Sequence, residues 1–147
     1  MRLGFLDEET VVQLLTKPID EFPPGAISAE LAHEIYRRSR GQPFLTQVYG
    51  YALVETLNRS KRKSATLDDI EQIEPELLSS YTYYFRGIWQ EVPPEGQAAL
   101  TALAHGEPIM LARETKRWLR RRMLVDDDGQ LLVPLFGRWI REKDEMV

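Results

Sequence analysis

The stretch Arg40-Gly41-Gln42-Pro43-Phe44-Leu45-Thr46-Gln47 decides how this 147-residue chain is organised. Glycine readily adopts the left-handed conformation that follows a helix end, and proline suits the first turn of a helix. The sequence therefore predicts a tight corner between two helices at residues 41–43. The free N–H groups that begin the second helix could accept an anion such as phosphate, but a plain helix-helix turn would have the same sequence.

Helical patterns lie on both sides of this corner. Asp7, Ser28 and Thr66 each stand where a capping residue would begin an apolar-periodic segment. The segment after Pro43 is apolar on most sides, which predicts the central helix of a bundle. A stripe of large apolar side chains then recurs at helical spacing: Leu77, Leu78, Tyr81, Tyr84, Phe85, Ile88 and Trp89. This stripe favours core or inter-domain packing over a ligand site.

Residues 92–96, which contain two prolines and a glycine, interrupt the helical pattern and predict a domain boundary. Beyond them we expect helices at residues 97–104 and 111–123, then a strand, a tight Asp128-Gly129 turn, a second strand and a last helix after Pro134. Two helices followed by a hairpin are typical of a winged helix. The predicted fold is mainly α, with a helical bundle over residues 1–92 and a winged-helix domain with a small β-hairpin over residues 93–147.

Residues 41–47 resemble the Gly-x-Pro-x-x-x-Gln segment in the lid of STAND-type P-loop ATPases, a branch related to AAA+ proteins. Residues 3–9, 66–70, 119–125 and 133–139 are also similar to segments of that family, in the same order. The resemblance implies a helical lid followed by a winged helix. It places Pro43 near the adenine or ribose of a bound nucleotide, with Gly41 and Gln42 beside it and Gln47 one turn further along.

Two departures from the family limit what the resemblance implies. The chain has no Gly-x-x-x-x-Gly-Lys-Ser/Thr segment, so the phosphate cradle of a P-loop is missing. We therefore expect no catalysis and no cofactor in this chain, with ATP or ADP bound by a parent protein and a separate or missing P-loop domain as partner. Residues 133–135 also lack the phosphate-sensing histidine found in some relatives.

Five cations share one face of the helix expected at residues 111–123: Arg113, Lys116, Arg117, Arg120 and Arg121. In a DNA-binding winged helix this position enters the major groove. However, the helix has no Asn or Gln to recognise bases, and the predicted hairpin tip is Asp126-Asp127-Asp128. A protein partner is therefore favoured over DNA for this face. A third hypothesis is a scaffold or oligomerisation module that uses the aromatic stripe.

Composition limits the kinds of site and the kinds of protein that this chain can be. The chain has 43% hydrophobic and 29% charged residues, no cysteine and a net charge of -4. The lack of cysteine excludes disulfides and thiolate metal sites, and the two histidines have no local pattern for zinc. No apolar run approaches the ~20 residues that span a bilayer. We therefore expect a cytoplasmic protein with no metal and no membrane partner.

Overall fold

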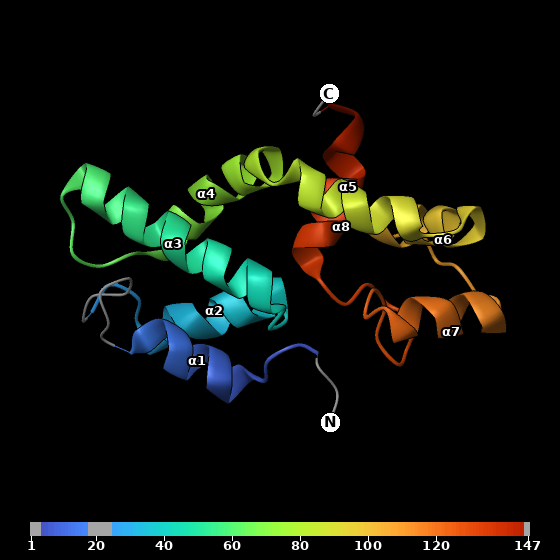
Figure 1. Ribbon diagram of the computed structural model, residues 1–147, viewed down its shortest axis with the longest axis horizontal. Helices are drawn as coiled ribbons and strands as arrows, with labels where there is room; N and C mark the ends of the chain where they lie inside the picture. The colour runs from blue at the N-terminus through green and yellow to red at the C-terminus, as the bar shows by residue number, and fades with distance from the viewer. Residues whose placement is uncertain (1–3, 18–24, 146–147) are drawn as a thin grey trace. The chain divides into compact units, whose positions relative to one another are not determined.

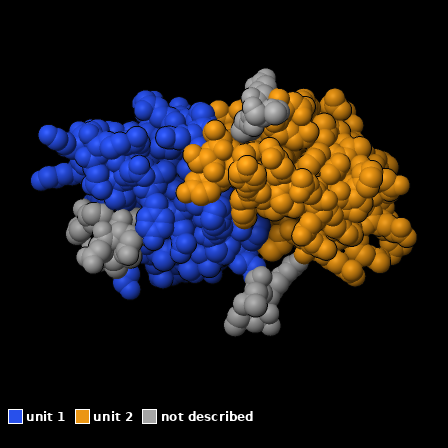
Figure 2. Space-filling model, turned by 45° about the horizontal axis from the view of Figure 1, so that its top comes forward, with its two compact units in different colours: residues 1–77 blue, residues 78–147 orange. Residues whose placement is uncertain are grey.

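The chain is described here by a computed structural model that covers residues 4–17 and 25–145. These residues form eight α-helices and one 3-10 turn (Figure 1). The chain divides into two compact units, Met1–Leu77 and Leu78–Val147 (Figure 2). The expected boundary at residues 92 and 93 lies later in the chain than this division. The assignment of the two regions to a lid and a winged-helix domain stays a prediction.

Unit 1 begins with two capped helices. In α1 (Glu8–Thr16) the side chain of Asp7 accepts a hydrogen bond from the N–H of Thr10 at 2.8 Å. Hydrogen bonding by the side chain and then by the N–H of Thr10 lowers the pKa of Asp7. In α2 (Ala29–Ser39) the side chain of Ser28 accepts from the N–H of Leu31 at 3.1 Å. Both caps were predicted. The two helices pack side by side (Figure 1), and residues 18–24 between them lie outside the described residues.

Helices α3 (Pro43–Ser60) and α4 (Leu67–Ser80) complete unit 1, although α4 continues a few residues into unit 2. The predicted cap of α4 is reciprocal: the N–H of Thr66 donates to Asp69 at 2.8 Å, and the N–H of Asp69 approaches the Thr66 hydroxyl at 3.4 Å. Arg62 also donates two hydrogen bonds to Asp69, and this guanidinium holds the pKa of Asp69 below its ordinary value.

The core of unit 1 is mostly apolar, and the polar residues buried in it are Ser39, Thr46, Asp69 and Glu74. Tyr49, on the predicted central helix, is fully buried, as are side chains from α1, α2 and α4. Glu74 is only 7% exposed; it accepts hydrogen bonds from the Tyr49 hydroxyl at 2.6 Å and from Arg38 at 2.8 Å. Arg38 also donates to Glu34 at 2.7 Å and lowers the pKa of that carboxyl. This network connects α2, α3 and α4 by charge-assisted hydrogen bonds.

Unit 2 contains α5 (Thr82–Glu91), α6 (Pro94–Ala104), α7 (Arg113–Arg121), α8 (Pro134–Glu142) and the 3-10 turn η1 (Lys143–Glu145). Its core is aromatic: the ring of Phe85 stacks on Phe136 and Trp139, with centroids 6.1 and 6.0 Å apart. The indole N–H of Trp139 donates to the Thr82 hydroxyl at 3.0 Å. Phe85, from the predicted aromatic stripe, is therefore a core residue of unit 2, whereas Tyr83 beside it is 79% exposed.

The predicted β-hairpin is wrong. Within the described residues no strand forms, and the segment after α7 makes a single antiparallel bridge between Val125 and Leu131. The pairing is limited to this bridge and to the hydrogen bonds from the Asp126 N–H to the Gln130 carbonyl at 2.8 Å and from the Leu132 N–H to the Leu124 carbonyl at 3.1 Å. Left-handed backbone at Met123, with a φ of 59°, lies just before one side of the turn, and Pro134, which has no N–H to donate, begins α8 just after the other. The turn itself forms as expected, with the N–H of Gly129 donating to the carbonyl of Asp126 at 3.0 Å. The mainly α fold class is confirmed.

No described helix is both long enough and apolar enough to cross a bilayer.

Candidate functional site

The corner predicted at residues 41–43 joins α2 to α3. The two consecutive residues Arg40 and Gly41 adopt left-handed backbone, and α3 begins at Pro43. Gly41 has a φ of 80°, and Arg40 before it has a φ of 55°. Left-handed backbone costs a residue with a Cβ roughly 1–2 kcal/mol. The sequence predicted the left-handed backbone of Gly41 but not that of Arg40, because arginine has no preference for this conformation. Pro43 occupies the first turn of α3 as predicted.

The backbone donors around this corner are already used. The side chain of Gln42 accepts from the N–H of Leu45 at 2.7 Å and caps α3. The N–H of Gln42 donates to the Ser39 carbonyl at 3.1 Å, and the N–H of Gly41 donates to the Ser39 hydroxyl at 3.2 Å. These groups would have to give up their partners before they could bind a phosphate. Pro43, by contrast, is exposed, and so is Gln47 one turn further along.

Two buried hydroxyls support the corner from inside. Ser39 and Thr46 are both fully buried, and their side-chain oxygens lie 3.4 Å apart. The Thr46 hydroxyl also donates to the carbonyl of Gln42 at 2.9 Å. Neither residue was predicted from the sequence, since a serine in a last turn and a threonine in a first turn have many other roles. Their spacing of seven residues across a predicted corner was the available signal.

The backbone of the N-terminal segment lies directly against Gly41. The N–H of Leu6 donates to the Gly41 carbonyl at 2.6 Å. A Cβ built on Gly41 would lie 1.9 Å from the carbonyl oxygen of Leu6, which is far inside the contact distance of non-bonded atoms. Only glycine therefore fits at this position, for reasons of both backbone conformation and space.

The predicted basic face forms on α7. Arg113, Lys116, Arg117 and Arg120 line a shallow depression of about 330 Å³, and Arg121 lies outside it. Within residues 4–17 and 25–145, neither an ion pair nor a hydrogen bond to a side chain is formed by Arg113, Lys116, Arg117 or Arg121. Uncompensated cations at this density attract anions and repel other cations.

The acidic turn that follows α7 lies beside this face. Arg120 approaches Asp127 to 3.5 Å, and the aliphatic stem of Lys116 lies close to Gly129, with its Cε 3.7 Å from the position of a Cβ on that glycine. Both members of the Arg120–Asp127 pair are exposed, so the pair is weak. The turn nevertheless brings carboxylates to the surface that a nucleic acid would have to approach.

The two histidines lie apart from both candidate sites. His33 contacts Glu8 at 2.7 Å across α1 and α2, and His105 contacts the carbonyl of Thr101 at 2.9 Å at the end of α6. In the part of the chain that the structure describes, no three His, Cys, Asp or Glu side chains group together in a way that could hold a metal ion.

Comparison with protein-family models, curated proteins and solved structures finds no match to this chain.

Proposed function

We propose that this chain is the lid and winged-helix unit of a STAND-type P-loop ATPase, and that it reports nucleotide state without catalysing a reaction. The observation that supports this function best is the contact between Leu6 and Gly41. This contact holds the segment around Leu6 against the corner at residues 41–43, where the family resemblance places the nucleotide.

In this proposal Pro43 is the residue that meets the nucleotide. Its ring is exposed at the corner, whereas the N–H groups of Gly41, Gln42 and Leu45 are engaged within the chain. The contact would therefore be apolar packing on the adenine or ribose rather than phosphate binding. Because Leu6 is hydrogen-bonded to the same corner, a displacement of Pro43 would move α2, α3 and the entering segment together.

The second part of the proposal concerns residues 93–147. The order α6, α7, turn, α8 matches two helices and a final helix of a winged helix, with the hairpin reduced to one bridge. This region would transmit lid movement to a protein partner, and the basic face of α7 would meet an acidic surface of that partner. ATP or ADP would be bound by the P-loop domain of the parent protein.

A two-component titration tests the proposal. Its first step is to identify a P-loop domain encoded in the same reading frame or by a neighbouring gene, and to measure its affinity for a fluorescent ATP analogue with and without this chain. We expect the chain alone not to bind Mg-ATP, but to tighten nucleotide binding by the P-loop domain. Pro43→Ala should weaken that effect, and Pro108→Ala, in an exposed loop of unit 2, should not.

Three results would overturn the proposal. The first is tight, magnesium-dependent ATP binding by this chain alone. The second is the lack of any P-loop segment in the surrounding genomic sequence, and the third is a P-loop domain whose nucleotide affinity this chain leaves unchanged.

A second candidate function, DNA binding through α7, is favoured by the four cations that line one depression. Anisotropy of a labelled DNA duplex at two salt concentrations tests it. Phosphate contacts would give binding that weakens steeply with salt, and the double variant Arg113→Ala/Arg117→Ala would reduce it. If the duplex does not bind at low salt, this candidate is excluded and the protein-partner role remains.

A further inference from the structure

The segment that connects α6 to α7 in unit 2 is extended and apolar. Residues 107–112 form neither helix nor turn. Met110 is 95% exposed, more than any other large hydrophobic side chain in the described residues, and Ile109 is 40% exposed. Leu111 points the other way, with its Cδ1 3.3 Å from the position of a Cβ on Gly129. Met110 and Leu111 therefore lie on opposite sides of the backbone, as successive residues of a strand do.

The backbone of this segment has unused hydrogen-bonding groups. In the part of the chain that the structure describes, the N–H and C=O groups of Ile109, Met110 and Leu111 form no hydrogen bond. The turn after α7 makes only the bridge between Val125 and Leu131, so it offers this segment no strand to pair with. A row of free donors and acceptors on an exposed, extended segment is a template for pairing with another chain.

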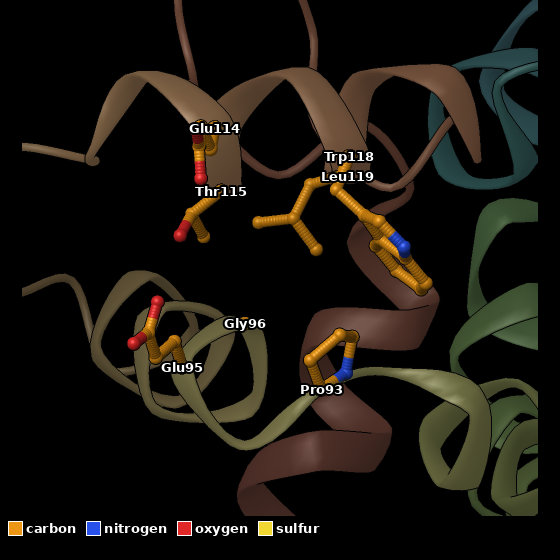
Figure 3. Close-up of a pocket in the computed structure, with 7 residues that line it drawn as sticks. All are labelled: Pro93, Glu95, Gly96, Glu114, Thr115, Trp118 and Leu119. Carbon is orange, nitrogen blue, oxygen red and sulfur yellow. The ribbon is translucent and has the colours of Figure 1, made fainter.

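Opposite charges stand at the two ends of the apolar stretch, and both are uncompensated. Glu107 precedes it, and Arg113, the first residue of α7, follows it. Both side chains are exposed, and over residues 4–17 and 25–145 neither forms an ion pair or a side-chain hydrogen bond. Figure 3 shows Thr115 and Trp118 extending from α7 toward α6, whereas Arg113 lines the basic depression on another face of α7. The guanidinium of Arg113 is therefore open to a partner.

We propose that this segment pairs with the same segment of a second copy of the chain, as two short antiparallel strands related by a two-fold axis at Met110. In this register Met110 faces Met110, Ile109 faces Leu111, and Glu107 faces Arg113. The surface is self-complementary, which a two-fold dimer requires. Each unpaired carboxylate of Glu107 meets the unpaired guanidinium of Arg113 on the other copy, and this charge complementarity selects a second copy as the partner.

Pro108 decides which residue pairs exchange hydrogen bonds. Antiparallel strands alternate between hydrogen-bonded and non-hydrogen-bonded pairs. When Ile109 and Leu111 exchange hydrogen bonds, Pro108 and Ala112 form a non-hydrogen-bonded pair, in which the N–H that proline lacks is not needed. Met110 then also falls in a non-hydrogen-bonded pair, where facing side chains approach most closely, so the two methionines cover each other.

The cations of α7 do not oppose this arrangement. Because the paired strands are antiparallel, the two copies of α7 leave the pair at opposite ends. At roughly 3.3 Å per residue, the Arg113 positions of the two copies are about 20 Å apart along the strands. This separation exceeds the Debye length of about 8 Å at physiological ionic strength, so the repulsion between them is screened. The nearest charge to each Arg113 is instead Glu107 of the other copy.

Sedimentation equilibrium and NMR of the full chain over a range of concentrations test the proposal. A short strand pair with exposed ion pairs is weak, so we expect a dimer Kd on the order of 0.1–1 mM. The mean molar mass should rise toward twice that of the chain as the concentration approaches about 1 mM. Over the same range the amide signals of Ile109 and Leu111 should shift, because their N–H groups gain acceptors.

Charge-exchange variants test the register. Glu107→Arg or Arg113→Glu alone places like charges opposite each other at both ends of the strand pair, and each should weaken the dimer about fivefold. The double variant Glu107→Arg/Arg113→Glu exchanges the two charges and should restore the original Kd. Glu55→Arg, on the exposed side of α3, makes the same change in net charge as Glu107→Arg and should leave the Kd unchanged.

Four outcomes would overturn the proposal. The first is a molar mass that stays that of one chain at about 1 mM. The second is a double variant that associates no better than the single variants. The third is association whose amide shifts miss Ile109 and Leu111, and the fourth is equal weakening by Glu55→Arg, which would attribute the effect to net charge. None of these measurements involves a nucleotide, so the pairing can fail while the proposed lid function stands, and the reverse also holds.

Discussion

The N–H of Leu6 donates a 2.6 Å hydrogen bond to the carbonyl oxygen of Gly41, and the two backbones approach so closely that no other residue type fits at Gly41. This contact joins segments 35 residues apart in sequence. It makes the entry to α1 and the corner between α2 and α3 a single structural feature, and its disruption should be measurable as a loss of stability.

Gly41→Ala should destabilise unit 1 by about 2–4 kcal/mol. Roughly 1–2 kcal/mol comes from the left-handed backbone, and the remainder from the displaced Leu6 segment with its hydrogen bond. Gly25→Ala is the control, because Gly25 has nearly the same φ, 79°, but no atom within 4 Å of an added Cβ. Gly25→Ala should lose only the part of the stability that comes from the left-handed backbone. Thermal unfolding of both variants checks this, and equal losses would contradict the steric role of Leu6.

Glu74→Ala should destabilise the chain by about 2–4 kcal/mol. The substitution removes the acceptor that the buried Tyr49 hydroxyl and Arg38 share, although Arg38 keeps Glu34 as a partner and is itself partly exposed. Glu71→Ala, on the exposed side of α4, should change stability by less than about 0.5 kcal/mol. Urea unfolding of the two variants gives the comparison. Similar values for both would show that the network adds little.

Phe85→Ala should cost about 3–5 kcal/mol, because it opens a cavity beside the stacked rings of Phe136 and Trp139. Tyr83→Ala, which truncates a 79% exposed ring on the same helix, should cost less than about 0.5 kcal/mol. Unfolding followed by tryptophan fluorescence measures both. Light scattering on the Tyr83 variant adds a second readout: a change in molecular mass would show that this exposed ring, which lies outside the predicted stripe, takes part in assembly.

Stability should fall in alkali because burial raises the pKa of Tyr84 to about 12 from an ordinary value of 10. The folded state favours the neutral phenol of Tyr84. The stability that this preference contributes is therefore fully present below pH 10 and is lost as pH rises through about 12. We expect a loss of about 1–2 kcal/mol across this window, allowing for solvent around the half-buried ring. Tyr84→Phe should lack this part of the alkaline loss, whereas Tyr83→Phe should retain it. Identical pH profiles for the two variants would contradict the assignment.

Local signals in the sequence predicted much of the secondary structure. The caps at Asp7, Ser28 and Thr66, the glycine at the left-handed position and the proline in the first turn of α3 all form where expected. Each depends on hydrogen bonds or steric limits that act within four residues. For the same reason the Asp-Gly turn forms, but the predicted strands on either side of it do not.

The sequence by itself determined that this chain is mainly helical, where most helices begin, and that a rigid corner follows α2, because capping and backbone preferences act locally. Only the tertiary structure decided that Leu6 lies on Gly41 and that Glu74 lies between Arg38 and Tyr49. Those relationships join residues distant in sequence, and they arise from the packing of helices against one another, which no short-range pattern encodes.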